Sequence, residues 1–268
     1  MVKQTILLVL MLVSLDSQAQ IPEISLSDAR KIGQLIWKNE AGMQKELLTF
    51  WNEHESHPSL GIGHNIWFPE QAEQKSTEQF PELCRYFKRH RVALPDWLDQ
   101  AQDGRAPWAN REEFQNDTAR LTDLRTLLAS NIELQTQFMI ERLEQRWPLI
   151  IAQVSADQQA RVIDNFNLLV ATPLGLYTMI DYLNFKGDGL NPQEERGGYR
   201  WGLAQVLSEM PSGLTKATVQ QAFAISAVKV LVRLIEHAGT DYDRIRFLKG
   251  WVNRVSTYHD YKLFEAEK

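Results

Sequence analysis

Residues 25–42 read SLSDARKIGQLIWKNEAG and predict an amphipathic helix. Ser25 is typical of a helix N-cap, and the final glycine is typical of the residue that ends a helix. Apolar side chains recur at helical spacing and place Ile32 and Ile36 on one face. Glu40 follows at the same spacing, so the sequence puts a carboxyl at the end of the buried face.

The predicted position of Glu40 has a chemical consequence. Burial and the negative end of the helix dipole both favour the protonated form of a carboxyl group. A carboxylic acid that stays neutral near neutral pH can protonate the leaving group of a glycosidic bond. Exposure of Glu40 at a frayed helix end is the alternative, and periodicity alone does not decide between the two.

Downstream of this helix, SLGIGHNIWF at 59–68 is the best candidate for β-structure, because two glycines precede Ile, Trp and Phe. We expect a small β-hairpin within 57–68. Strong 3.6-residue periodicity elsewhere predicts an α+β fold that is predominantly helical. Further helices are expected at 43–52, 121–128, 130–147, 157–170, 173–183, 201–210 and 216–237.

The chain begins with Lys3, an apolar run and small residues at Ser17 and Ala19, a pattern that predicts a signal peptide over 1–19. We therefore expect an exported protein without a stable membrane anchor after cleavage, and one domain over 20–268. A polar segment at 69–117, interrupted by prolines and a glycine, predicts an insertion of short helices and loops.

Composition limits the possible partners and compartments. The net charge of −5 argues against nucleic-acid binding. Cys84 is the single cysteine, so no intramolecular disulfide can form and a core must hold the fold. An exported protein without disulfides suits the periplasm of a Gram-negative bacterium, although secretion is also possible. No motif predicts a cofactor.

NEAG at 39–42 followed by SLGIGH at 59–64 resembles the active-site region of phage-type lysozymes, which are muramidases of the lysozyme-like superfamily. The resemblance implies a two-lobed fold and a catalytic role for Glu40. It also implies that Ser59 replaces the family's catalytic threonine, and that Glu53 holds the position of its second acid.

The chain departs from the family between these motifs, where its segment is several residues longer. Glu55 therefore competes with Glu53 for the role of second carboxylate. The resemblance assigns structural roles to Gly61, Gly63 and His64, with the histidine pairing with an acid between the two lobes.

Substrate-binding candidates come from aromatic and helical patterns. Trp67 and Trp201 offer flat apolar faces to sugar rings, although most tryptophans in helical proteins lie in the core. WGLAQVL at 201–207 weakly resembles a helix of lytic transglycosylases, and this adds Gln205 to the candidates for the cleft. The long glycine-rich loop at 184–200 is a further source of cleft groups or a lid.

A metal site is the competing interpretation for His54, His57 and His64, which alternate with glutamates. Their spacing is not that of the helical HExxH motif, so a solvated loop is favoured and no metal is expected.

The sequence thus predicts an exported glycoside hydrolase that cleaves peptidoglycan or a related polysaccharide. A non-catalytic periplasmic protein that binds glycan or acts as a scaffold is the alternative.

Overall fold

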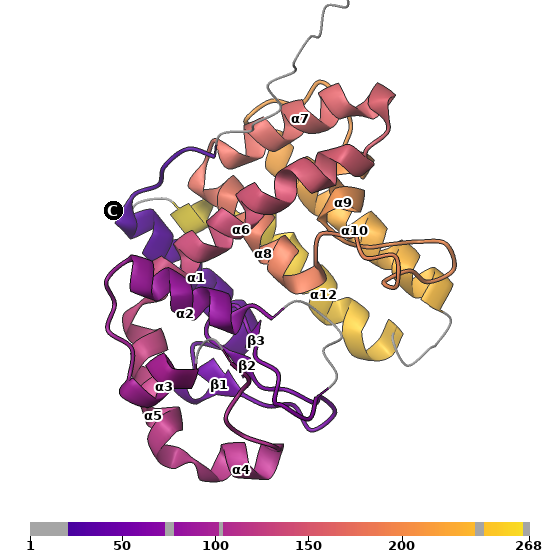
Figure 1. Cartoon of the computed structure of the whole chain (residues 1–268). Helices are drawn as coiled ribbons and strands as arrows, with labels where there is room; N and C mark the ends of the chain where they lie inside the picture. Colours follow the sequence, from indigo (N-terminus) through magenta and orange to yellow (C-terminus); the bar gives the residue numbers. More distant parts are fainter. Residues whose placement is uncertain (1–20, 73–77, 102–103, 239–243, 265–268) are drawn as a thin grey trace, which may run out of the picture.

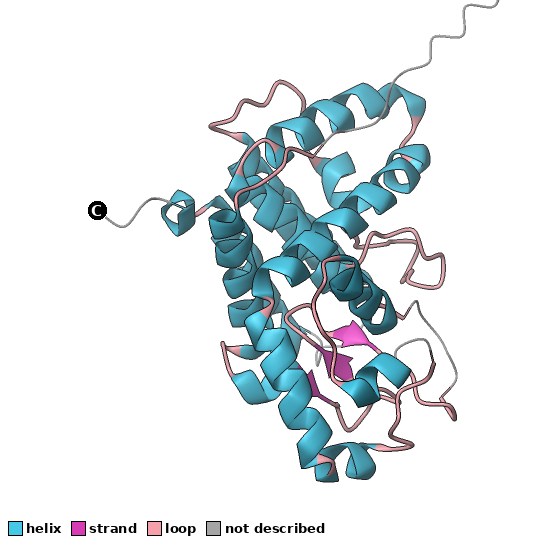
Figure 2. Cartoon of the chain, turned by 60° about the vertical axis from the view of Figure 1, so that its left-hand side comes forward, coloured by secondary structure: helices cyan, strands magenta, loops and turns pink. Residues whose placement is uncertain are grey.

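The computed structural model describes residues 21–72, 78–101, 104–238 and 244–264. The expected signal peptide over 1–19 lies outside these residues. Helices dominate the described residues, and a small three-stranded antiparallel sheet lies toward one end of the molecule, which confirms a predominantly helical α+β fold (Figure 2).

The first half of the chain holds the strands and several short helices. They are α1 (Leu26–Ala41), the 3₁₀ helix η1 (Lys45–Leu48), β1 (Thr49–Phe50), β2 (Ser59–Leu60), β3 (Asn65–Ile66), α2 (Phe80–Arg89), α3 (Asp96–Ala101), α4 (Arg111–Asn116) and α5 (Thr118–Ser130).

The second half is helical. It contains α6 (Ile132–Gln153), α7 (Ala156–Val170), α8 (Pro173–Lys186), α9 (Leu203–Glu209), α10 (Val219–Ala238), the π-helical η2 (Arg244–Leu248), α12 (Lys249–Ser256), and the 3₁₀ helices η3 (Thr257–His259) and η4 (Tyr261–Phe264).

Helix α1 begins and ends as its sequence predicts. The Ser25 hydroxyl accepts a hydrogen bond from the backbone N–H of Asp28, and Gly42 adopts the left-handed conformation that closes the helix. The predicted stripe is buried, and α1 packs against α6 and α8. Gly33 permits the close approach to α6, because a Cβ there would lie 2.5 Å from Thr136 Oγ1.

The sheet runs in the order β1-β2-β3, with Ser59 of β2 opposite Phe50 and Ile66. The β2–β3 hairpin falls within the predicted range of 57–68. The helix predicted at 43–52 is wrong, because only the short 3₁₀ turn η1 forms before the chain enters β1. The pairing with β2 outweighs the helical pattern of this short segment.

The long helix α6 passes through the middle of the molecule (Figure 1). The sheet and α3–α5 lie at one end, whereas α7, α9 and α10 gather toward the other. Helices α1, α8 and α12 lie between these regions. The segment 69–117 contains short helices and loops, as predicted, and it buries Trp108 and Leu83 in the core.

Several helix boundaries differ from the predictions, most clearly those of α6 and α8. A helix starting at Ser130 and ending before Pro148 was expected, but α6 starts at Ile132 and continues through Pro148 to Gln153. Burial of Ile150 and Ile151 beyond the proline stabilises the extra turn against its missing hydrogen bond. The loop predicted from residue 184 begins later, because α8 extends to residue 186.

In the part of the chain that the structure describes, no helix combines the length and apolar character needed to cross a membrane.

Candidate functional site

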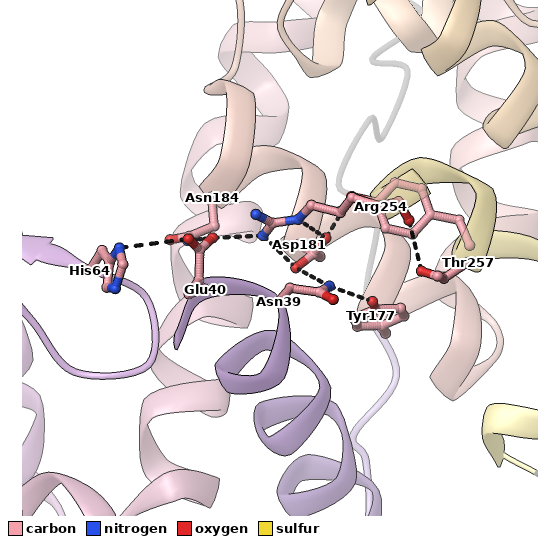
Figure 3. Close-up of polar contacts among 9 residues, drawn as sticks. Asn39, Glu40, His64, Tyr177, Asp181, Asn184, Arg254 and Thr257 are labelled. Carbon is pink, nitrogen blue, oxygen red and sulfur yellow. Dashed lines mark hydrogen bonds and ion pairs between the residues drawn. The ribbon is translucent and has the colours of Figure 1, made fainter. Parts of the chain in front are cut away.

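The side chain of Glu40 lies where three other parts of the fold meet the end of α1. Its Oε1 accepts hydrogen bonds from Asn184 Nδ2 on α8, at 3.2 Å, and from Arg254 Nη2 on α12, at 2.6 Å. Its Oε2 lies 3.6 Å from His64 Nδ1, which belongs to the β2–β3 turn. Figure 3 shows the histidine and the arginine on opposite sides of the carboxylate, whose side chain is 15% exposed.

Arg254 connects Glu40 to a second, fully buried carboxylate. Its Nε donates to Asp181 Oδ2 at 2.9 Å, and its Nη2 donates to Asp181 Oδ1 at 2.8 Å. Burial alone would lower the pKa of Arg254, but the charge and hydrogen bonds of Asp181, together with the charge of Glu40, raise it above its ordinary value. The guanidinium is therefore a permanent cation shared by two acids.

A further set of donors fixes Asp181. Tyr258 donates its hydroxyl proton to Asp181 Oδ2 at 2.5 Å, and Asn39 Nδ2 lies 3.3 Å from Oδ1. The Asn39 amide also donates to the Tyr177 hydroxyl at 2.8 Å. Burial and the negative charge of Asp181 raise the pKa of both tyrosines, so both hydroxyls keep their protons. The neighbour of Glu40 in sequence thus anchors the same network.

The glycines of the GIGH turn allow it to pack closely on the helices. Gly61 has φ +79°, and a Cβ at that position would collide with Gln135 Oε1. The same Gln135 oxygen accepts a hydrogen bond from Ile62 N at 3.0 Å. A Cβ at Gly63 would collide with the Met139 side chain of α6. These contacts hold the turn against α6 and fix the residue that follows it.

That residue is His64, which adopts φ +49°, a conformation that few side chains other than glycine tolerate. Its Nδ1 faces Glu40, whereas its Nε2 is buried without a hydrogen-bond partner among the described residues. Ser59, which the resemblance implies as the replacement for the catalytic threonine, lies in β2, is 8% exposed, and shows no polar contact with Glu40 among the described residues.

Glu53 and Glu55, the candidates for the second carboxylate, lie in the loop between β1 and β2. Both residues are exposed, and the Glu53 side chain is 70% exposed beside His54, its ion-pair partner at 3.5 Å. The loop is closed by a hydrogen bond from Trp51 Nε1 to the backbone oxygen of Glu55 at 2.9 Å. Neither carboxylate contacts Glu40 within the described part of the chain.

The other predicted binding residues are distributed between core and surface. Trp67 is fully buried, and its Nε1 donates to the backbone oxygen of Gly104 at 3.1 Å. Trp201 is half-buried in the loop before α9. Gln205 connects that loop to α9, since its Oε1 accepts from Gly202 N at 2.9 Å and its Nε2 donates to Gly189 O.

The three clustered histidines lie in different surroundings. His54 is exposed beside Glu53, the His57 ring packs edge-on against Phe68, and His64 faces Glu40. Among the described residues, no three His, Cys, Asp or Glu side chains lie together as they would around a metal ion.

The prediction from burial and the helix dipole omitted two charged groups beside Glu40. Arg254 places its guanidinium 2.6 Å from Glu40 Oε1, and Asp181 pairs with the same guanidinium at 2.8 Å. Glu40 is therefore the partly exposed member of a group of two acids and one cation.

Sequence analysis missed Arg254 and Asp181, although one signal pointed to the aspartate. Asp181 is the only charged residue between Pro173 and Phe185, in a helix that is otherwise almost entirely apolar. A carboxylate buried in such a helix requires a cationic partner. The sequence did not identify that partner, which lies 73 residues further along the chain. Asn184 was included only as part of the long loop.

No protein-family model matches the chain, and neither does any curated protein or solved structure.

Proposed function

We propose that the protein is an exported glycoside hydrolase with a lysozyme-like two-lobed fold that cleaves the glycan strands of peptidoglycan. The observation that carries this proposal is the placement of Glu40. Its carboxyl is partly exposed, lies between the hairpin and the helical part of the chain, and is held by Asn184, Arg254 and His64. A proton donor needs this combination of fixed position and access to a ligand.

In the proposed reaction, protonated Glu40 donates its proton to the glycosidic oxygen as the bond to the anomeric carbon breaks. The carboxylate that remains accepts the hydrogen bond from Arg254. Water then attacks the anomeric carbon. Glu53 and Glu55 are the candidates from the sequence for the base that activates this water, and Ser59 is the candidate for positioning it.

Digestion of purified peptidoglycan by the wild-type protein and by Glu40→Gln tests this role. Mass spectrometry of the released muropeptides should show a rate about 10²–10⁴-fold lower for the variant, because the amide has no proton to donate. Glu112→Gln, which changes an exposed glutamate on α4, is the matched control and should keep full activity. Full activity of Glu40→Gln would contradict the mechanism.

A second candidate function is glycan binding without cleavage in the periplasm. Its support is that Glu53 and Glu55 are exposed and that neither contacts Glu40 among the described residues. Sedimentation of the protein with insoluble peptidoglycan separates the two functions. Binding without any release of muropeptides would favour a binding or scaffolding role over hydrolysis.

A further inference from the structure

A cavity of about 460 Å³ lies between α7 and the segment that leads from α9 to α10, at the end of the molecule away from the sheet (Figure 1). This volume is within the range of sites that bind small molecules. Hydrogen bonds join the two walls. Arg161 Nη2 donates to the backbone oxygen of Ser208, and Asn165 Nδ2 donates to that of Pro211, both at 3.0 Å. The walls are therefore braced against each other around the cavity.

The cavity is lined by opposite charges that do not pair with each other. Asp164 follows Arg161 by three residues on α7, a spacing at which ion pairs often form, yet the guanidinium donates to backbone oxygens instead. Lys216 lines the other wall. Among the described residues, neither Asp164 nor Lys216 forms an ion pair or a side-chain hydrogen bond. The cavity thus offers one acid and one cation to a ligand.

The wall between α9 and α10 also carries backbone donors. The N–H groups of Ser212, Gly213 and Leu214 form no hydrogen bond with other described residues. Gly213 adopts φ +72°, and no atom lies within 4 Å of where its Cβ would be, so this turn is open to an incoming group. Successive backbone N–H groups in a turn are a typical site for a carboxylate, and Lys216 adds its positive charge to this wall.

We propose that this cavity binds a short peptide that has free termini and an apolar side chain. Lys216 and the N–H groups of residues 212–214 bind the C-terminal carboxylate, and Asp164 binds the N-terminal ammonium. Leu168 lines the same cavity and provides an apolar contact for the side chain. The site uses no residue of the network around Glu40, so the proposal goes beyond hydrolysis and does not depend on it.

A ligand with only one charge would leave part of the cavity unsatisfied. A simple anion can pair with Lys216 but is repelled by Asp164, and the reverse holds for a simple cation. A free amino acid carries both charges but is much smaller than the cavity. A charge-assisted hydrogen bond in a partly exposed site is typically worth a factor of about five in affinity. Neutralising either terminus of the peptide should weaken binding by about this factor.

Isothermal titration calorimetry with the dipeptide alanyl-leucine, its N-acetylated form and its C-terminal amide tests this inference. The wild-type protein should bind the free dipeptide about fivefold more tightly than either capped form. Asp164→Asn should lose the preference for the free N-terminus and keep that for the free C-terminus. Lys216→Met should reduce the preference for the free C-terminus and keep the other. Asp157→Asn, at an exposed acid of α7 outside the cavity, should keep both preferences.

The opposite results would overturn the proposal. They are no measurable binding of the dipeptide at millimolar concentration, equal binding of the free and capped forms, or unchanged preferences in Asp164→Asn and Lys216→Met. Free leucine that binds as tightly as the dipeptide would assign the cavity to an amino acid and overturn the assignment to a peptide. Cleavage of peptidoglycan that depends on Glu40 is measured separately and would stand in any of these cases.

Discussion

The region around Glu40 and the loop from residue 51 to residue 58 both carry acids close to the sheet, but they are built differently. Glu40 is fixed by side chains from α8, α12 and the hairpin turn. Glu53 extends into solvent beside a single exposed histidine. The spacing of two acids in sequence therefore does not indicate which of them is positioned for chemistry. The hydrogen-bond donors around each acid do.

The largest loss of stability in the Glu40 region is expected when its shared cation is removed. Arg254→Met leaves the fully buried Asp181 without its charge partner, and we expect a loss of about 3–5 kcal/mol in the free energy of unfolding. Urea denaturation followed by circular dichroism measures the loss. Replacing His54 of the exposed pair with Gln should change stability by less than about 0.5 kcal/mol. A similar loss in both variants would show that Arg254 contributes no more to stability than the exposed His54.

The glycine turn offers a second test of how tightly this region is built. Gly61→Ala introduces a Cβ at φ +79° that also collides with Gln135, so we expect a loss of about 2–3 kcal/mol. Gly213→Ala is the matched control, since Gly213 has φ +72° with no atom near the added Cβ. It should lose only about 1 kcal/mol, and equal losses would show that the collision is unimportant.

The sequence could predict the parts of the molecule whose structure depends on local signals. Local signals placed α1 correctly, because the Ser25 cap, the apolar stripe and Gly42 all act within one helix. The hairpin was placed correctly from its glycines and the Ile, Trp and Phe that follow them. The helix prediction over 43–52 is wrong because the pairing of this segment with Ser59 and Leu60 is a tertiary effect, which helical periodicity does not contain.

The candidate site was predicted only in part for the same reason. Glu40 could be identified from its place on α1, and His64 from the motif that contains it. Arg254 could not, because nothing in its local sequence shows that α12 folds back against α1 and α8. Long-range ion pairs depend on the packing of whole helices, and a single sequence does not encode that packing in any short pattern.

The half-buried side chain of Lys186 should make the free energy of unfolding depend on pH. Burial and the nearby charge of Arg254 lower its pKa from 10.5 to about 7, so between these values the unfolded chain binds a proton that the folded chain does not. The contribution of Lys186 to folding is therefore least favourable below about pH 7 and becomes more favourable as pH rises toward 10.5.

Lys186→Met removes this dependence. We expect the variant to melt at least about 2 °C above the wild-type protein at pH 6, and the difference should shrink by pH 9. Differential scanning calorimetry at both pH values measures it, with Lys262→Met as the exposed control. A constant difference between Lys186→Met and the wild-type protein across this range would show that Lys186 titrates normally.

The smallest effects are expected at the acids of the loop from residue 51 to residue 58. Glu53→Gln and Glu55→Gln each change an exposed side chain that does not contact Glu40, so the variant at the acid that does not serve as the base should hydrolyse peptidoglycan within about tenfold of the wild-type rate. Muropeptide release is measured for these variants and for Glu40→Gln in the same experiment, and the loss in Glu40→Gln is the reference for a catalytic residue. A loss of about 10³-fold in one of them would assign the second catalytic carboxylate to that residue. The loop would then have to move toward Glu40 when substrate binds, since neither acid contacts it in the described structure.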